Sequence, residues 1–298
     1  MAERPVLIAV DVTAASEQAL RQGLDAATRR GAPAVVVHVM PDLMRVRSLF
    51  PQLESSDALD AVTLGRRVQE NIEGWLNERG VQRDAVTLRI ESGEAHVRIT
   101  ELAVELNAAL VVLGSTPRRE DTAVNLGGTA ERVLRHAPVP VLIARESPAK
   151  GIVVGATDLS EASEPALYAA AREAKLRGMP LTALAVVDAD AELQTLSLLA
   201  RYSSYAGEAM VHGFEKLVAE TTKRLDALLS RLEITAERDV RTGVAATLIS
   251  RHAREHGATL VVVATHGATG FSRVLVGSVA ETVARSAPCS VLVVRAAS

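Results

Sequence analysis

The amino-acid sequence repeats itself, and this duplication limits what the chain can fold into more than any other feature. Residues 127–145 (GGTAERVLRHAPVPVLIAR) and 277–295 (GSVAETVARSAPCSVLVVR) are identical at ten of nineteen positions, at an offset of 150. Residues 6–20 repeat as 153–167 at an offset of 147, which predicts a three-residue insertion in the second copy after residue 187. In a chain of 298 residues, such a repeat predicts two similar domains, which we place at 1–146 and 150–298.

Each copy alternates short aliphatic runs with segments whose apolar residues have helical spacing. Continuous aliphatic runs are typical of parallel strands buried on both faces, and strand–helix alternation favours an open, doubly wound α/β sheet. The predicted strands are 6–10, 34–39, 86–90, 109–114 and 140–144 in the first copy, and 152–156, 182–187, a weak one near 239–241, 259–264 and 290–294 in the second. We therefore expect an α/β protein with two doubly wound, flavodoxin-like parallel sheets.

Composition excludes several classes of function. Lys plus Arg (33) nearly balance Asp plus Glu (36), unlike the basic excess of a nucleic-acid binder, and aromatic residues make up only 2% of the chain. The single cysteine, Cys289, indicates a reducing compartment. No apolar run approaches the ~20 residues of a membrane helix. We expect a cytoplasmic protein that binds neither nucleic acid nor membrane.

Ligands of such sheets bind beyond the carboxyl ends of the strands, and residues 264–281 (ATHGATGFSRVLVGSVAE) lie there. Gly267 follows the predicted strand, and Gly277 and Ser278 open a helix. Glycines let the backbone approach a phosphate, and a helix N-terminus favours an anion. The alternative is that Ser278 and Glu281 form a capping box and that the glycines only make turns.

At this point the sequence resembles the universal stress protein family, in its tandem type. The resemblance rests on the spacing Gly-two residues-Gly-nine residues-Gly-Ser at 264–278, although Ala264 replaces the first glycine. It rests further on an aspartate after each first strand, on the pair His38–Val39, and on Ala-Pro-x-x-Val-Leu at 137–142 and 287–292. These aspartates are Asp11 and Asp158.

The resemblance implies an ATP-binding protein with Mg²⁺ as the expected companion. Asp158 and the backbone of Val186 would contact adenine and ribose, and the glycine-rich loop and the following helix start would hold the phosphates. For Asp158, capping of the next helix stays an alternative. The residues that the resemblance assigns to the nucleotide are Ala156, Thr157, Asp158, Val186, Ala264, His266, Gly267, Gly277, Ser278 and Val279. It also implies strand order 3-2-1-4-5, an adenine-nucleotide-hydrolase-like sheet, a pseudo-two-fold relation between the copies, and a homodimer of chains.

The first copy departs from this pattern at residues 114–131 (GSTPRREDTAVNLGGTAE). Pro117 replaces the middle glycine and has no N–H to donate, and Gly128 replaces the serine. Arg118 and Arg119 stand beside Glu120 and Asp121, as in a solvated loop. We expect one ATP per chain, bound by the second copy. Weaker candidates in the first copy are Asp11, Val39, Gly114 and Gly127.

Two other patterns favour packing over chemistry. His252 and His256 have the spacing of two metal ligands on a helix, but the duplication aligns them with Leu102 and Leu106 on a packing stripe. Cys289 aligns with Val139, which indicates a small apolar residue at the entry to a strand. We assign no metal site and no catalytic residue. The leading hypothesis is therefore an ATP-binding regulator of the stress response. The alternatives are a slow ATPase or nucleotidyl-transferring enzyme, and a dimeric scaffold without nucleotide.

Overall fold

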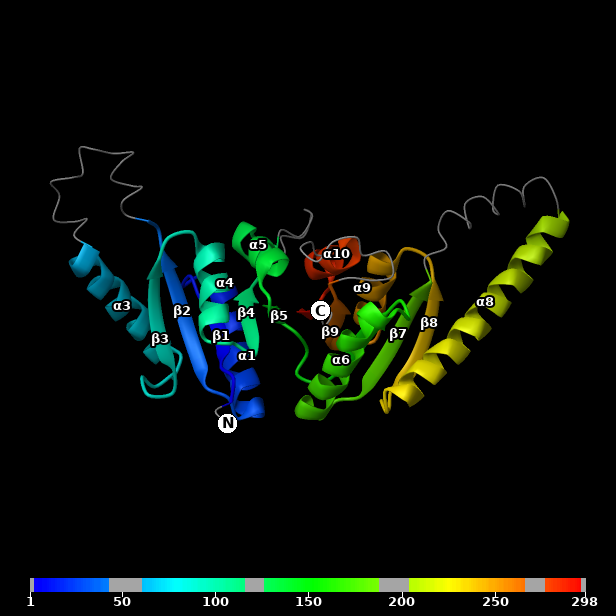
Figure 1. The fold of residues 1–298 in the computed structure, drawn as a ribbon, viewed down its shortest axis with the longest axis horizontal. Helices are drawn as coiled ribbons and strands as arrows, with labels where there is room; N and C mark the ends of the chain where they lie inside the picture. The colour runs from blue at the N-terminus through cyan, green and yellow to red at the C-terminus, as the bar shows by residue number, and fades with distance from the viewer. Residues whose placement is uncertain (1–2, 43–60, 116–125, 188–203, 266–276, 296–298) are drawn as a thin grey trace. The chain divides into compact units, whose positions relative to one another are not determined.

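A computed structural model describes residues 3–42, 61–115, 126–187, 204–265 and 277–295 of the chain (Figure 1). The chain divides into two compact units, 1–145 and 146–298.

Unit 1 is a five-stranded parallel sheet in the order β3-β2-β1-β4-β5, which confirms the predicted topology. The strands lie where the aliphatic runs predicted them, because Val6, Leu7 and Ile8 and their neighbours are fully buried. Its elements are β1 (Val6–Ala9), α1 (Ala14–Arg30), β2 (Ala34–Met40), α3 (Ala61–Glu78), β3 (Thr87–Ser92), α4 (Ala95–Glu105), β4 (Leu110–Gly114), α5 (Gly128–His136) and β5 (Val141–Ala144).

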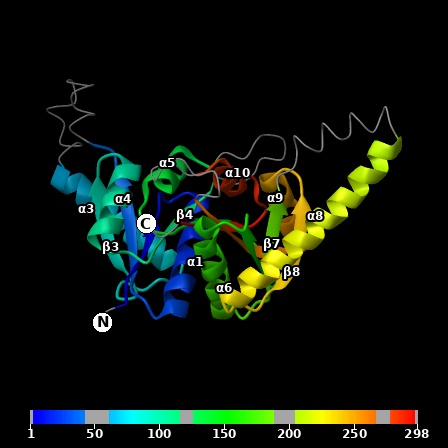
Figure 2. The same ribbon diagram turned by 45° about the vertical axis from the view of Figure 1, so that its right-hand side comes forward.

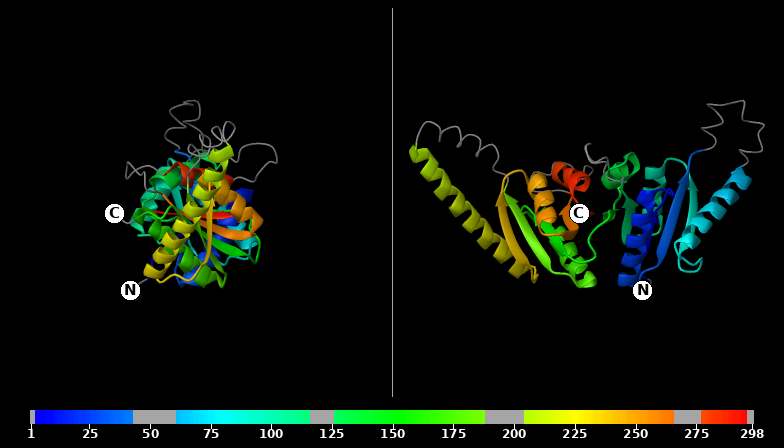
Figure 3. Two further views of the ribbon diagram at one scale, coloured as in Figure 1. Left: turned by 90° about the vertical axis from the view of Figure 1, so that its right-hand side faces the viewer. Right: turned by 180° about the vertical axis from the view of Figure 1, so that it is seen from behind.

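Unit 2 repeats this arrangement, with its strands in the order β10-β9-β6-β7-β8. Helices α6 and α8 share one cluster of buried side chains on one face of the sheet, and α9 and α10 pack together on the other (Figure 2; Figure 3). The elements are β6 (Ile152–Thr157), a short 3₁₀ helix (Glu161–Ser163), α6 (Glu164–Arg177), β7 (Leu181–Val187), α8 (Ser204–Arg231), β8 (Glu237–Thr242), α9 (Ala245–Glu255), β9 (Ala258–Ala264), α10 (Ser278–Ser286) and β10 (Ser290–Val294).

The two units differ most between their second and third strands. Helix α8 has 28 residues against 18 in α3, and in Figure 1 its N-terminal part extends beyond the strands. The loop that follows it is shorter, because two residues (235–236) stand where unit 1 has five (82–86). The predicted three-residue insertion is therefore the net result of a lengthened helix segment and a shortened loop.

Candidate functional site

The first strand of unit 2 ends in a tight turn at the carboxyl edge of the sheet. Asp158 is exposed, and its Oδ1 accepts hydrogen bonds from the N–H of Ser160 (3.0 Å) and from its hydroxyl (2.5 Å). The carboxylate thus closes a local turn around Leu159 and caps no α-helix, since α6 begins after Ser163. Thr157 is buried and its Oγ1 lies 2.7 Å from the Ser163 hydroxyl. Asp158 stands at the edge where a ligand would bind.

The equivalent aspartate of unit 1 is held more tightly. Oδ1 of Asp11 accepts the hydroxyls of Thr13 and Ser16, both at 2.5 Å, and the N–H of Thr13 at 3.2 Å. Burial alone would raise the pKa of Asp11, but the hydrogen bonds from Ser16 and Thr13 outweigh it and hold this pKa below its ordinary value. Asp11 therefore has a structural task at the start of α1.

The residue after each aspartate has a left-handed backbone, with φ of 62° at Val12 and 64° at Leu159. This conformation is strained for a side chain with a Cβ, and most of all for a β-branched residue. Leu159 packs against the buried cluster of α6, β7 and α8, which offsets the strain. Val12 is 40% exposed. Both units thus store backbone strain at this edge, a feature that often accompanies binding sites.

The glycine-rich segment of unit 2 is anchored at both of its described ends. Ala264 ends β9, and the buried Thr265 donates its N–H to the carbonyl of Val294 (2.9 Å). The carbonyl of Thr265 accepts the N–H of Gly277 at 2.6 Å. A Cβ on Gly277 would lie 2.8 Å from that carbonyl oxygen, so this position requires glycine because of close approach. His266 and Gly267 lie outside the described residues.

Helix α10 starts without a capping side chain, so the capping-box interpretation is wrong. Gly277 is the N-cap residue and Ser278 is the first helical residue, one position too late to cap. Glu281 pairs with Arg285 at 2.7 Å. Among the described residues, the hydroxyl and N–H of Ser278 and the N–H of Val279 have no hydrogen-bond partner. Both residues are exposed, and the start of α10 therefore offers unsatisfied donors to an anion.

The two glycines of unit 1 are required for different reasons. Gly127 has φ of 85° and ψ of 135°, a conformation that favours glycine, whereas Gly277 has φ of −62°. A Cβ on Gly114 would lie 2.1 Å from the carbonyl oxygen of Ala15, so Gly114 makes room for the first turn of α1. Gly128 begins α5 without a hydroxyl. Pro117, Arg118 and Arg119 lie outside the described residues.

The remaining predicted residues lie on strands. Ala156 and Val186 are buried at the ends of β6 and β7, so their contribution to a ligand site falls mainly to their backbones. Val39 is half-buried on β2, opposite Glu91 of β3. The preceding His38 lies 2.9 Å, through Nδ1, from the carbonyl oxygen of Val10, and this contact ties the ends of β1 and β2 together.

Two arginines at this edge were not among the predicted site residues. Arg145 follows β5 and donates through Nε to the Ser115 hydroxyl (3.0 Å), beside the start of the first copy's loop. Arg295 follows β10, and burial lowers the pKa of its guanidinium below its ordinary value. Arg145 and Arg295 are the last residues of the repeated segments 127–145 and 277–295. The sequence could have pointed to them, because an arginine stands at the same place in both copies.

The histidine pair of α9 divides into one buried and one exposed ring. His252 is 2% exposed, His256 is exposed, and their rings stack with centroids 4.1 Å apart. Nδ1 of His252 lies 3.0 Å from Oδ2 of Asp239, without the alignment of a hydrogen bond. Burial and the nearby His256 lower the pKa of His252. No group of three metal-ligating side chains occurs among the described residues.

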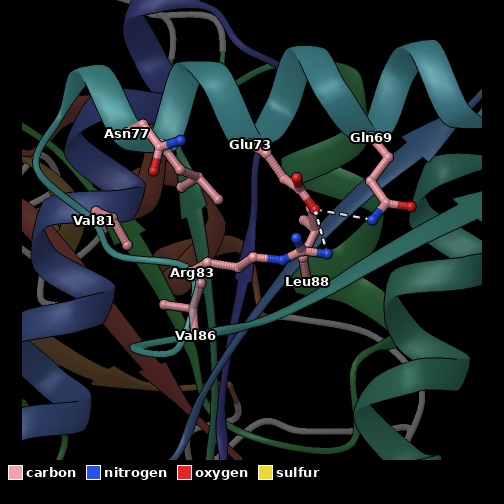
Figure 4. Close-up of a pocket in the computed structure, with 8 residues that line it drawn as sticks. Gln69, Glu73, Asn77, Val81, Arg83, Val86 and Leu88 are labelled. Atoms are coloured by element: carbon pink, nitrogen blue, oxygen red, sulfur yellow. Dashed lines mark hydrogen bonds and ion pairs between the residues drawn. The ribbon is translucent and has the colours of Figure 1, made fainter.

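Several cavities lie away from the carboxyl edge. Figure 4 shows one of about 220 Å³ between α3 and β3, where Glu73 accepts the Gln69 amide (2.9 Å) and pairs with Arg83 (3.5 Å) above Val86 and Leu88. None of the predicted nucleotide residues lines it. In the part of the chain that the structure describes, no helix has the length and apolar character needed to cross a bilayer.

The fold is that of a tandem of two doubly wound α/β domains. The model of the universal stress protein family matches residues 3–145 and again 150–295. The chain therefore belongs to the universal stress protein family and contains two of its domains.

Known relatives span the whole chain. A universal stress protein of Mycolicibacterium smegmatis is 26% identical over 306 residues, covering 98% of this chain and 97% of that protein. One from Mycobacterium tuberculosis is 27% identical over 297 residues, covering 97% and 96%. The crystal structure of a universal stress protein from Archaeoglobus fulgidus matches with a TM-score of 0.65 at 19% identity and covers 99% of each chain, which shows the same fold.

Proposed function

We propose that this tandem universal stress protein binds ATP in unit 2 and acts as a regulator of the stress response through its nucleotide state. The observation that carries the proposal is the start of α10, where Ser278 and Val279 present an exposed hydroxyl and two N–H groups without intramolecular partners among the described residues. Such donors at a helix N-terminus suit the phosphates of a nucleotide. The Thr265–Gly277 hydrogen bond holds this helix start against the end of β9.

We assign the nucleoside to the rest of the same edge. Asp158 stands exposed after β6, beside the buried end of β7, where a carboxylate could accept a ribose hydroxyl. Mg²⁺ would be bound chiefly through the phosphates, because the described residues hold no cluster of metal-ligating side chains. When bound, ATP would supply a triphosphate whose charge the α10 dipole and its N–H groups offset.

Unit 1 serves as the internal comparison. Its helix α5 starts with Gly128, so the hydroxyl that Ser278 offers is missing at that position. We therefore assign the nucleotide to unit 2 and expect unit 1 to bind ATP weakly or not at all.

The test is native mass spectrometry of the purified chain. We expect one adenine nucleotide to co-purify with the wild type, to be lost from Ser278→Ala and to be retained by Thr129→Ala, the exposed first-turn substitution in unit 1. Co-purification that is unaffected by Ser278→Ala, or lost from Thr129→Ala, would contradict the assignment. Product release under single-turnover conditions separates this regulator from a slow ATPase or nucleotidyl-transferring enzyme.

Self-association belongs to the same proposal. We expect two tandem chains to form a homodimer, so light scattering at micromolar concentration should give twice the chain mass of 31.5 kDa. A mass equal to one chain would refute the dimer and leave nucleotide binding untouched.

A further inference from the structure

The loop between α8 and β8 carries a residue that the fold alone does not explain. In both units the preceding helix ends in the same hydrogen-bonded turn, in which Val81 N–H donates to Leu76 O (3.0 Å) and Ile234 N–H to Leu229 O (2.9 Å). The residue before each donor has a left-handed backbone. In unit 1 it is Gly80, with φ of 73°, but in unit 2 it is Glu233, with φ of 55°. A glutamate there is less stable than a glycine.

The loop 232–236 of unit 2 has a hollow on each of its sides. A groove of about 550 Å³ lies between residues 233–236, the end of α6 and the start of β7. A second hollow of about 500 Å³ lies between the same residues and the end of α8. Unit 1 has equivalent hollows of about 460 and 220 Å³, and its extra loop residues Gln82 and Ala85 line the larger one. The first hollow of unit 2 is called the α6–β8 groove below.

The α6–β8 groove combines an apolar floor with a charged rim. Ala174 and Leu181 are buried in its floor, and Met179, Ile234 and Ala236 are half-buried there. Methionine is typical of surfaces that adapt to a partner, and unit 1 has Ala32 at this place. The rim residues are Lys175, Glu233 and Glu237, all exposed.

The two carboxylates of this rim have no paired cation in the part of the chain that the structure describes. Neither Glu233 nor Glu237 makes an ion pair with any described residue. The neighbouring Arg238 forms its ion pair with Asp226. Unit 1 has no acid at these two positions, because Gly80 replaces Glu233 and Thr87 replaces Glu237. This pair of carboxylates therefore belongs to unit 2, and the chain keeps Glu233 at a cost in backbone strain.

We propose that the α6–β8 groove binds an extended segment of a partner protein in which aliphatic side chains alternate with lysine or arginine. The aliphatic side chains would cover Met179 and Ile234, and the basic ones would pair with Glu233 and Glu237. The groove lies at the amino ends of β7 and β8, away from the carboxyl edge assigned to ATP, so it does not depend on nucleotide binding.

The test follows the methionine and isoleucine methyl signals of the full chain by NMR during titration with the peptide Lys-Leu-Lys-Leu-Lys. We expect the Met179 and Ile234 signals to shift, and Glu233→Gln with Glu237→Gln to weaken binding tenfold or more. Glu220→Gln, an exposed acid on α8, should change nothing. Glu233→Gly should weaken binding while raising the melting temperature, which a folding defect could not do.

Three results would overturn the proposal. The first is that the Met179 and Ile234 methyl signals do not shift at millimolar peptide. The second is that Glu220→Gln weakens binding as much as the groove variants do. The third is that the peptides Lys-Ser-Lys-Ser-Lys and Glu-Leu-Glu-Leu-Glu bind as well as Lys-Leu-Lys-Leu-Lys.

Discussion

Replacing Gly277 by alanine should weaken nucleotide binding without unfolding unit 2. The backbone at Gly277 has φ of −62° and ψ of 149°, which alanine adopts freely, so the substitution acts only through space. The new Cβ would lie 2.8 Å from the carbonyl oxygen of Thr265, and an ordinary contact begins at 3.4 Å. The start of α10 must therefore move by roughly half an ångström and loosen the 2.6 Å hydrogen bond from Gly277 to Thr265.

This shift misaligns the donors of Ser278 and Val279. A hydrogen bond to a charged group is worth about 1.5–3 kcal/mol, so losing one weakens ATP binding roughly 10- to 100-fold. The assay is fluorescence anisotropy with a fluorescent ATP analogue, with urea unfolding of the same samples as a check on the fold.

Gly127→Ala is the matched control in unit 1. At φ of 85° and ψ of 135° the alanine is strained, so it should lower the free energy of unfolding by about 1–3 kcal/mol and leave ATP affinity unchanged. The reasoning is refuted if Gly277→Ala binds the analogue like the wild type, or if Gly127→Ala is the variant that loses it.

Three further changes test other parts of the structure. His252→Leu, which introduces the residue of unit 1, should flatten the fall in stability on acidification. The pKa of His252 is lowered in the folded state, so the wild type loses stability as pH falls through the ordinary value of 6.5 toward that lowered pKa. If the free energy of unfolding falls equally steeply with pH in the wild type and in His252→Leu, this reasoning is wrong. Gly114→Ala should destabilise unit 1 by about 1–3 kcal/mol or more, because its Cβ would meet the backbone of Ala15 at 2.1 Å; unchanged thermal unfolding would contradict that contact. Val12→Gly should raise the melting temperature, since it relieves a left-handed valine that is 40% exposed; a lower melting temperature would show that the side chain stabilises the loop.

The strands were predictable because a short, continuous aliphatic run is buried most simply as a strand covered on both faces. Every predicted strand is present, and even the weak one near Asp239 is β8. The duplication also predicted where the glycines of the two edges lie, but it could not give their reasons. Gly114 is required by a backbone contact with Ala15, and Gly277 by one with Thr265, and neither contact is local in sequence.

Local rules failed where a helix began one residue away from its expected start. Ser278 and Glu281 have the spacing of a capping box, yet Gly277 takes the N-cap position because Thr265 holds its N–H. Similarly, His252 follows the packing stripe while His256 is exposed, although the duplication aligns it with the half-buried Leu106. The sequences of α3 and α8 differ too much to be aligned by eye. The comparison of the two copies therefore gave only the net three-residue insertion, and not the longer helix and the shorter loop that produce it.

We propose that the chain has one ATP site, in unit 2. Isothermal titration calorimetry of the nucleotide-free chain with ATP and Mg²⁺ measures the number of sites and their affinity. We predict one ATP per chain in the wild type, an affinity roughly 10- to 100-fold weaker in Ser278→Ala, and wild-type affinity in Thr129→Ala. Two sites of similar affinity, or no binding heat at all in the wild type, would contradict the account.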